Sequence, residues 1–481
     1  MVRASGPSKG CRTCRRRRVK CDERQPLCAR CERGGFDCEG YGRALSFVSE
    51  NSRAKRRSLK QEALRAKSIG KGELRRRSTA TGSEADLTMA ARPPSELTCA
   101  AFKDEIQISF TFAKLFAWDE KSIAWLSWGY KSSGYSINSD ALKALSGIYY
   151  GRAHHETSVE RYGCVHYTKT LRALREAIDS NRGMLLDVLL AGMSALCYEM
   201  IASPSYGGLL LHAGGIGRLI ELRGPEQHRD AFELHLLSTM RNSICIKAML
   251  DRKRCFLERE EWKTIPWSSH PEGRAMVEWV QDIMCDVPGL YEDYDTLSAS
   301  DMSPEAYRVG HEKLKANIYH HLELLSDWRA QWEHRYPQTC HERAPHFPQS
   351  PFTTVISFQD LEAANGLMLY NALYIILSNL QLRLLGREHD WRYHTGTRMK
   401  ASNPVLNPLG ASLHEAAVEI CRSVEYYFSP PYESVGAFFM TFPLKVAYNQ
   451  LPVGDPGGRW LKGLMVTLAA KSGMRFSTGV L

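Results

Sequence analysis

Six cysteines with a repeated spacing lie within the first forty residues of the chain, and thiol side chains at such spacing can bind metal. They read C-x2-C-x6-C twice, at Cys11, Cys14, Cys21, Cys28, Cys31 and Cys38. A structural zinc ion takes four ligands in a tetrahedron, so two ions require eight ligand positions. Six thiolates supply eight positions only if two of them bridge both ions. The spacing therefore predicts a cluster of two zinc ions held by six cysteines.

Two other chemistries use paired cysteines, and the surrounding residues argue against both. Disulfides are typical of exported proteins, but the chain opens with Arg3 and Lys9 and shows no apolar segment ending at a cleavage site. The pairs Cys11–Cys14 and Cys28–Cys31 have the spacing of redox dithiols, yet that chemistry accompanies a βαβ unit. Their flanks are short, basic and almost free of β-branched residues. We therefore favour structural zinc and expect no export signal.

A basic run follows the second cysteine, formed by Arg15, Arg16, Arg17, Arg18 and Lys20. Two Zn²⁺ and six thiolates carry a formal charge of −2, which partly neutralises these cations. A short helix over residues 13–20 would spread the side chains over about two turns and fit the major groove of DNA. Arginine suits this place because its planar guanidinium can bond O6 and N7 of guanine together. The plainer interpretations are a nuclear-localisation patch or a solvated face; inside a metal-held module we favour DNA binding.

At this point the residues match a known family. Residues 11–38 resemble the fungal binuclear zinc cluster, the two-zinc, six-cysteine DNA-binding domain of fungal transcription factors. The similarity rests on the cysteine spacing, the basic run, the step Lys20-Cys21-Asp22, and Pro26 between the two halves. The resemblance implies a nuclear, zinc-dependent regulator of transcription by RNA polymerase II that binds double-stranded DNA and reads CGG-type triplets.

The same resemblance implies roles for individual residues. The first and fourth cysteines, Cys11 and Cys28, would bridge the two ions. One further pair would complete each site, Cys14 with Cys21 and Cys31 with Cys38. The bases would be read from the positions before the third cysteine, which here are Arg17 and Arg18. The phosphates would be held by Arg15 and Lys20, with Arg12 as a further candidate. Family members more often carry lysine at one base-facing position, which leaves the preferred triplet open.

The distribution of charge supports a DNA-binding module at one end of the chain. Residues 1–80 contain 23 Lys and Arg against 8 Asp and Glu, a net charge of +15, whereas the whole chain carries +10. The remaining residues are therefore mildly acidic, at −5. A general polyanion-binding protein would spread its basic residues over its whole surface, and this chain concentrates them.

The composition divides the chain into three parts: a zinc-cluster domain over residues 1–43, a basic linker over 44–100, and a folded region over 101–481. The linker is rich in Arg, Lys and Ser with few apolar residues, so we expect it to be disordered. Its leucines and isoleucine recur every fifth residue, at Leu59, Leu64, Ile69 and Leu74. That period fits no coiled-coil seam, so monomer and dimer both stay open.

Helical periodicity dominates the region from residue 101 onward and predicts a large all-α domain, so that the chain as a whole is mostly α. Apolar residues recur at i, i+3 or i+4 in Leu142–Tyr150, Tyr167–Ile178, Leu185–Ala202, Gly208–Arg223, Phe232–Leu250, Leu361–Leu385, Leu413–Phe428 and Trp460–Ala470. Strands are scarce. Helix ends are predicted at Gly224-Pro225, Gly386 and Pro430-Pro431.

This second region also resembles a known one. Stretches such as Leu210–Gly215, Arg218–Glu226, Arg252–Leu257 and Ile265–Trp267 look like the fungal-specific regulatory domain that follows zinc clusters. The resemblance is diffuse and implies a helical regulatory domain without naming a ligand. We expect it to control transcriptional output by contacting co-regulators.

Several functions find no support in the sequence. Motifs for metalloproteases, serine hydrolases and nucleotide-binding enzymes are missing, so we expect no enzyme activity. The most apolar stretch, Leu185–Ala202, contains Asp187 and Glu199 and predicts a buried core helix rather than a membrane span. The segment Asp286–Asp295 mixes acidic and aromatic residues as some activation segments do, and we interpret it as a solvated loop between helices. The rival hypotheses are a protein-interaction scaffold whose basic face serves only import, and a metal-regulated enzyme.

Overall fold

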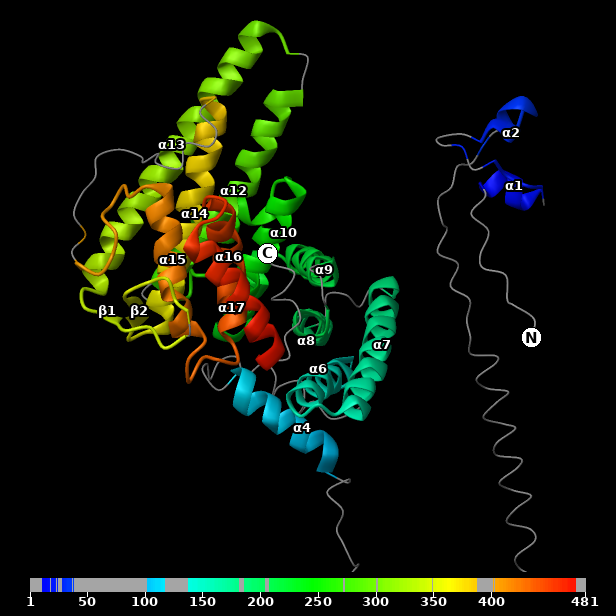
Figure 1. Cartoon of the computed structure of the whole chain (residues 1–481), viewed down its shortest axis with the longest axis horizontal. Coiled ribbons are helices and arrows are strands. Elements are labelled where there is room, and N and C mark those ends of the chain that lie inside the picture. The colour runs from blue at the N-terminus through cyan, green and yellow to red at the C-terminus, as the bar shows by residue number, and fades with distance from the viewer. Residues whose placement is uncertain are drawn as a thin grey trace, which may run out of the picture. The chain divides into compact units, whose positions relative to one another are not determined.

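The computed structural model describes residues 11–17, 19–22, 24, 28–36, 38, 102–116, 137–180, 186–203, 207–270, 273–299, 302–347, 349–386, 401 and 403–472. The chain divides into two units, Met1–Pro93 and Pro94–Leu481, and each is described by itself (Figure 1). The predicted linker over residues 44–100, including its evenly spaced leucines, lies outside the described residues.

The first unit contains two short helices, α1 (Arg12–Arg16) and α2 (Ala29–Arg33). Each begins directly after the first cysteine of a C-x2-C pair. The buried cluster of this unit consists of four sulfur side chains with Val19 packed against them, namely those of Cys11, Cys14, Cys28 and Cys31. So small an apolar cluster cannot offset the entropy of ordering the chain, which is why such a module depends on metal to fold.

The second unit is built from helices and one hairpin. In chain order these are α4 (Lys103–Thr111), α6 (Ile137–Ala153), α7 (Thr157–Asp179), α8 (Leu186–Ala202), α9 (Gly207–Arg223), α10 (Ala231–Asp251), α11 (Glu260–Thr264), α12 (Met276–Ala299), α13 (Pro304–Arg335), β1 (Cys340–Arg343), β2 (Val355–Phe358), α14 (Leu361–Leu384), α15 (Leu413–Tyr427), α16 (Gly436–Gln450) and α17 (Pro456–Ser472). A π-helical turn, η2 (Phe112–Phe116), extends α4, and two 3-10 turns, η3 (Pro225–His228) and η4 (Phe256–Glu258), flank α10.

Successive helices pack on one another in the first half of this unit. α6 contacts α7 and α8, α8 contacts α9, and α9 contacts α10. The backbones of α6 and α7 approach closely at Gly163, where an added Cβ would lie 2.7 Å from the nitrogen of Ile148 and 2.9 Å from the carbonyl oxygen of Ala144. Any larger residue would push these two helices apart, so the close pair depends on glycine.

α14 lies at the centre of the second half of this unit. It contacts α12, α13, α15 and α16, and Figure 1 shows it running among them. Leu367, Leu373 and Leu377 on this helix are fully buried. The two strands pair antiparallel, with Cys340 opposite Phe358 and β2 packed on α15. The hairpin therefore closes one side of a helical core.

The eight helices predicted from periodicity are all present, and the predicted all-α character of the large region is confirmed. α9 ends at Arg223 before Gly224, and α14 is followed by Gly386; both glycines have positive φ, at 78° and 64°. These left-handed conformations are the reason the helices stop there. α8 is a buried helix, as its uniformly apolar sequence predicts. None of the described helices combines the length and the hydropathy that crossing a bilayer requires.

The interpretation of Asp286–Asp295 as a solvated loop is wrong, because the segment lies inside α12. Its acidic side chains suggested exposure, but they pair with the basic stretch that follows α10. The Arg252 guanidinium donates to Asp295 at 2.6 Å, and the Lys253 amine donates to Glu292 at 2.9 Å. Val287 and Leu290 of the same segment are buried. The ion pairs and this burial together explain why the segment is helical although its composition indicated a loop.

The longest helix, α13, was also missed, although its core face follows a helical period. Its many charged residues and histidines mask a stripe of buried side chains, namely Leu314, Ile318, Leu322, Leu325, Trp328 and Trp332. These residues are spaced at three or four positions, as one face of a helix requires.

Candidate metal centre and nucleic-acid interface

The two halves of the cysteine repeat build the same local structure twice. Cys11 precedes α1, and Cys28 is the N-cap of α2. In the first half the backbone N–H of Cys14 donates to the Cys11 sulfur at 3.4 Å, and in the second half the N–H of Cys31 donates to the Cys28 sulfur at 3.3 Å. Equal spacing therefore gives equal geometry, because each helix start presents its amides to the preceding sulfur.

The hydrogen bonds to the third cysteine of each half repeat this equivalence. The Cys11 N–H donates to the Cys21 sulfur, and the Cys28 N–H donates to the Cys38 sulfur, both at 3.4 Å. Amide donors around a sulfur stabilise its negatively charged form, so these bonds prepare the thiols to act as thiolate ligands.

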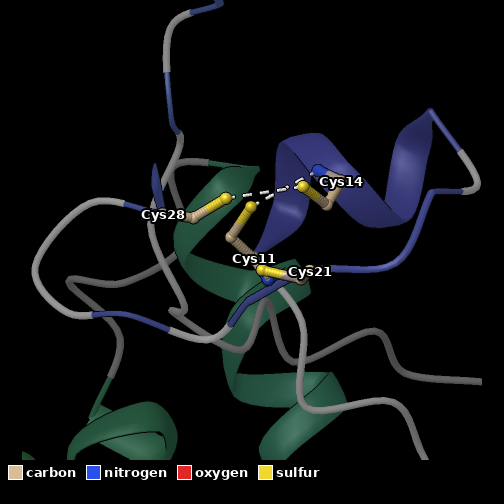
Figure 2. A group of neighbouring side chains, drawn as sticks. All are labelled: Cys11, Cys14, Cys21 and Cys28. Atoms are coloured by element: carbon tan, nitrogen blue, oxygen red, sulfur yellow. Dashed lines mark hydrogen bonds between the residues drawn. The ribbon is translucent and has the colours of Figure 1, made fainter. Parts of the chain in front are cut away.

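The sulfur atoms gather into two groups of four. The first tetrad is Cys11, Cys14, Cys21 and Cys28 (Figure 2), and the second tetrad is Cys11, Cys28, Cys31 and Cys38. Within each tetrad all sulfurs lie within 4.8 Å of one another. Cys11 and Cys28 belong to both tetrads, which is the arrangement that two bridging thiolates require.

Sulfur separations fit zinc ligation and exclude disulfides among these six residues. The sulfurs of Cys14 and Cys28 are 3.6 Å apart, those of Cys11 and Cys31 are 3.8 Å apart, and all six cysteines are free. A disulfide needs about 2.05 Å. Two thiolates bound tetrahedrally to one zinc at about 2.3 Å would lie roughly 3.8 Å apart. These two separations therefore match edges of zinc tetrahedra, and the sulfurs of Cys14 and Cys31, which belong to different tetrads, also lie 3.7 Å apart.

Because these sulfur atoms are buried, they can exist as thiolates only when a cation compensates their charge. Cys11, Cys14, Cys28 and Cys31 have no exposed surface, and burial raises the pKa of the Cys11, Cys14 and Cys31 thiols to about 12. Without metal these thiols stay protonated at neutral pH, whereas Zn²⁺ stabilises the thiolates and displaces the protons. A donor set made only of sulfur, in groups of four, suits Zn²⁺.

The basic residues predicted to contact DNA lie at the first half of the repeat. Arg15 lies on α1, and its side chain is not described, as is also true of Arg12. Arg17 and Lys20 are described and exposed, at the end of α1 and just before Cys21. Arg18 lies outside the described residues. The exposed Arg17 and Lys20 thus lie close in the chain to the ligand cysteines Cys14 and Cys21.

Sequence reasoning did not assign a role to Asp22, and the structure gives it one. Its carboxylate accepts hydrogen bonds from the backbone N–H groups of Ala29, at 3.0 Å, and Arg30, at 3.3 Å. These are free donors in the first turn of α2, so Asp22 caps this helix from the other half of the repeat. Asp22 lies seven residues before Ala29 in the chain, so no capping pattern in the sequence indicated this contact.

Replacing Asp22 with alanine is expected to weaken the second half of the cluster. Two amides at the start of α2 would lose their acceptor, which lowers the stability of the folded module. Because folding and metal binding are coupled, the measurement is zinc retention by the full chain in equilibrium with a chelator. Asp22→Asn keeps an acceptor oxygen and serves as the control. Equal retention by Asp22→Ala and the unsubstituted protein would contradict the capping role.

Comparison with known proteins identifies related sequences that match parts of this chain. Residues 9–46 match the fungal Zn(2)-Cys(6) binuclear cluster domain. The C6 finger domain transcription factor hasF of Aspergillus fumigatus is 41% identical over 81 residues, covering 13% of this chain and 11% of that protein. White-opaque regulator 2 of Candida albicans is 62% identical over 32 residues, covering 7% of each chain.

A longer similarity links the chain to an uncharacterized protein of Emericella nidulans, which is 30% identical over 136 residues, covering 27% of this chain and 29% of that protein. The chain thus matches less than a third of the length of each of these relatives. No solved structure matches the chain.

Proposed function

Residues 9–46 of this chain are a fungal Zn(2)-Cys(6) binuclear cluster domain, and from this premise we propose that the protein is a non-enzymatic, sequence-specific regulator of transcription by RNA polymerase II. It acts in the nucleus and binds double-stranded DNA through this domain. The observation that carries the proposal is the pair of sulfur tetrads that share Cys11 and Cys28, with exposed arginine and lysine beside them.

In this proposal the six cysteines hold two zinc ions. Cys11 and Cys28 bridge the ions, one ion is completed by Cys14 and Cys21, and the other by Cys31 and Cys38. The zinc ions have a structural role and no catalytic one. They neutralise the charge of the thiolates and hold the first residues of α1 and α2 in place, which the small apolar cluster could not do by packing. The metal-bound module then holds its basic side chains in one fixed arrangement relative to DNA.

The proposed DNA contacts divide into two kinds. Arg17 and Arg18 reach base edges in the major groove, where an arginine fork fits guanine, and CGG-type triplets are the proposed site. Arg15 and Lys20 contact phosphates, which sets the register without reading sequence. A net charge of +15 over residues 1–80 strengthens this attraction, while the acidic remainder of the chain does not compete for DNA.

The proposed domain order is the zinc cluster over residues 1–43, a basic linker over 44–100 and a regulatory domain over 101–481. The support for the last is its size and its helical architecture, with a continuous core around α14 and many exposed helix faces. We propose that this domain contacts co-regulators and controls output.

A binding titration with the zinc-loaded full chain tests the function. A duplex that contains a CGG triplet is compared with a duplex of the same composition in scrambled order, at physiological salt. We expect at least about tenfold tighter binding to the CGG duplex, as specific DNA binding requires. Equal affinity for both duplexes would refute sequence-specific recognition of this triplet, and absence of binding to either would favour a protein-interaction scaffold.

Substitutions at two neighbouring cations should separate the two kinds of contact. Arg18→Ala is expected to weaken binding to the CGG duplex by about 1–3 kcal/mol and to relax preference at one base pair. Lys20→Ala is expected to weaken binding to both duplexes alike and to reduce the slope of log affinity against log salt by about 1. The two variants lose the same charge and control for each other. A uniform loss from Arg18→Ala would assign that residue to phosphate.

A further inference from the structure

One exposed arginine of the basic run is held by an aromatic ring from the other half of the repeat. The guanidinium carbon of Arg17 lies 3.3 Å from the ring centroid of Phe36. The Phe36 side chain is 44% exposed, so no core packing accounts for its position. A planar guanidinium on a ring face is a favourable stack that leaves the N–H groups at the guanidinium edge free.

The backbone before Phe36 is shaped to bring the ring to this place. Gly35 has a φ of 65°, a left-handed conformation that favours glycine. A Cβ on Gly34 would lie 2.9 Å from the Phe36 ring, so a larger residue there would displace it. The Phe36 N–H donates to the carbonyl oxygen of Cys31 at 3.0 Å, which ties the ring to a residue of the second tetrad.

Comparison of the two halves of the cysteine repeat explains why, among the described residues, one half supplies the arginine and the other supplies the ring. A shift of seventeen residues superposes the cysteines of the repeat, and it places Gly34 and Gly35 at the positions of Arg17 and Arg18. The first half thus has cations where the second half has its glycine turn, although the second half carries Arg30 and Arg33 on α2. Phe36 corresponds to Val19, which packs against the sulfur cluster instead. At these positions the second half therefore supplies a ring that contacts a side chain of the first half.

We propose that Phe36 is a positioning residue for sequence recognition: it pre-organises the Arg17 guanidinium so that its edge points out to meet a base. This proposal rests on the proposed DNA-binding function. A free arginine must lose its rotamer freedom when it binds a base, whereas a stacked one has already lost part of it. Phosphate contacts tolerate a mobile cation, so the stack should raise discrimination between sequences more than affinity for DNA in general.

The test measures the zinc-loaded full chain against the CGG duplex and the scrambled duplex. Phe36→Leu keeps an apolar side chain but removes the ring face, and we expect it to bind the CGG duplex about three- to tenfold more weakly. Affinity for the scrambled duplex and its salt dependence should stay unchanged, because no charge is lost. Phe36→Tyr keeps the ring and should retain discrimination. Gly34→Ala, which displaces the ring, should behave as Phe36→Leu does.

A double-substitution cycle with Arg17→Ala distinguishes positioning from a general structural role. If Phe36 acts through Arg17, adding Phe36→Leu to Arg17→Ala should cause no further loss of discrimination. Additive losses, or a Phe36→Leu variant that discriminates as well as the unsubstituted protein, would overturn the proposal. Failure of the unsubstituted protein to discriminate would instead refute the proposed function itself.

Zinc content is the control for folding in every variant. Two zinc ions per chain are expected in Phe36→Leu, because the ring is exposed and the six cysteines that bind the ions are unchanged. If that variant binds fewer, Phe36→Met, an unbranched side chain without a ring, is measured in its place. Loss of zinc from both would overturn the positioning role and assign Phe36 to the stability of the metal core.

Discussion

Replacing Cys28 with alanine is expected to remove both zinc ions from the protein and to abolish binding to the CGG duplex. Cys28 belongs to both sulfur tetrads and is the N-cap of α2, so its loss leaves each ion with three ligands and the Cys31 N–H without its sulfur acceptor. Folding of a module this small is coupled to metal binding, so removing a shared ligand unfolds it. Zinc content of the purified full chain, measured by native mass spectrometry, gives the result directly.

Two other cysteines control this experiment. Cys38 belongs only to the second tetrad, so Cys38→Ala is expected to reduce affinity for one ion more than for the other. Cys164 is exposed on α7, far from either tetrad in the sequence, and Cys164→Ala should keep two ions and full DNA binding. A Cys28→Ala protein that still holds two zinc ions would refute the bridging assignment.

The second large effect concerns a buried ionic network in the helical region. Arg329 on α13 is 2% exposed and Glu419 on α15 is 1% exposed, and their charged groups lie 3.6 Å apart. Glu333 accepts from the Arg329 guanidinium at 3.0 Å. The Glu419 carboxylate also accepts from the Asn371 side chain at 2.9 Å and from the Asn407 N–H at 2.7 Å. One carboxylate therefore joins α13, α14, α15 and the loop before α15.

Glu419→Ala is expected to lower the free energy of unfolding of the helical region by about 3 kcal/mol, since it leaves a buried cation short of a partner and two amides without an acceptor. Burial opposes the charged form of Arg329, yet the carboxylates of Glu419 and Glu333 keep its pKa above the usual value, so the charge persists. Urea unfolding followed by far-UV circular dichroism measures the change. The zinc module should still bind two ions.

An exposed carboxylate on the same helix as Arg329 serves as the control for this prediction. Glu312 lies on the surface of α13, and its 3.5 Å pair with Lys315 is solvated. Glu312→Ala should change stability by less than about 0.5 kcal/mol, because exposed ion pairs contribute little. A Glu419→Ala effect no larger than the Glu312→Ala effect would show that the buried network does not stabilise this region.

Sequence patterns predicted those structural features that depend on residues close together in the chain. Eight helices followed from apolar spacing, because a helix repeats every 3.6 residues and marks its buried face on the chain. The same argument missed α12, whose acidic residues indicated a loop. Their partners lie in Arg252–Arg254, some forty residues earlier, and nothing within α12 itself indicates that pairing. A helix is mistaken for a loop in this way when its charged side chains form ion pairs with residues far away in the sequence.

By itself, the sequence determined the zinc-cluster module. Metal geometry is fixed by the ion, so ligand spacing along a short chain is enough to specify a cluster, and six cysteines in two equal repeats leave little freedom. Tertiary structure alone decided which side chains meet across larger separations. The ring of Phe36 under Arg17, the cap that Asp22 places on α2, and the burial of Arg329 with Glu419 all join residues whose spacing follows no period. Such contacts depend on how the chain folds back on itself, and no local pattern encodes that.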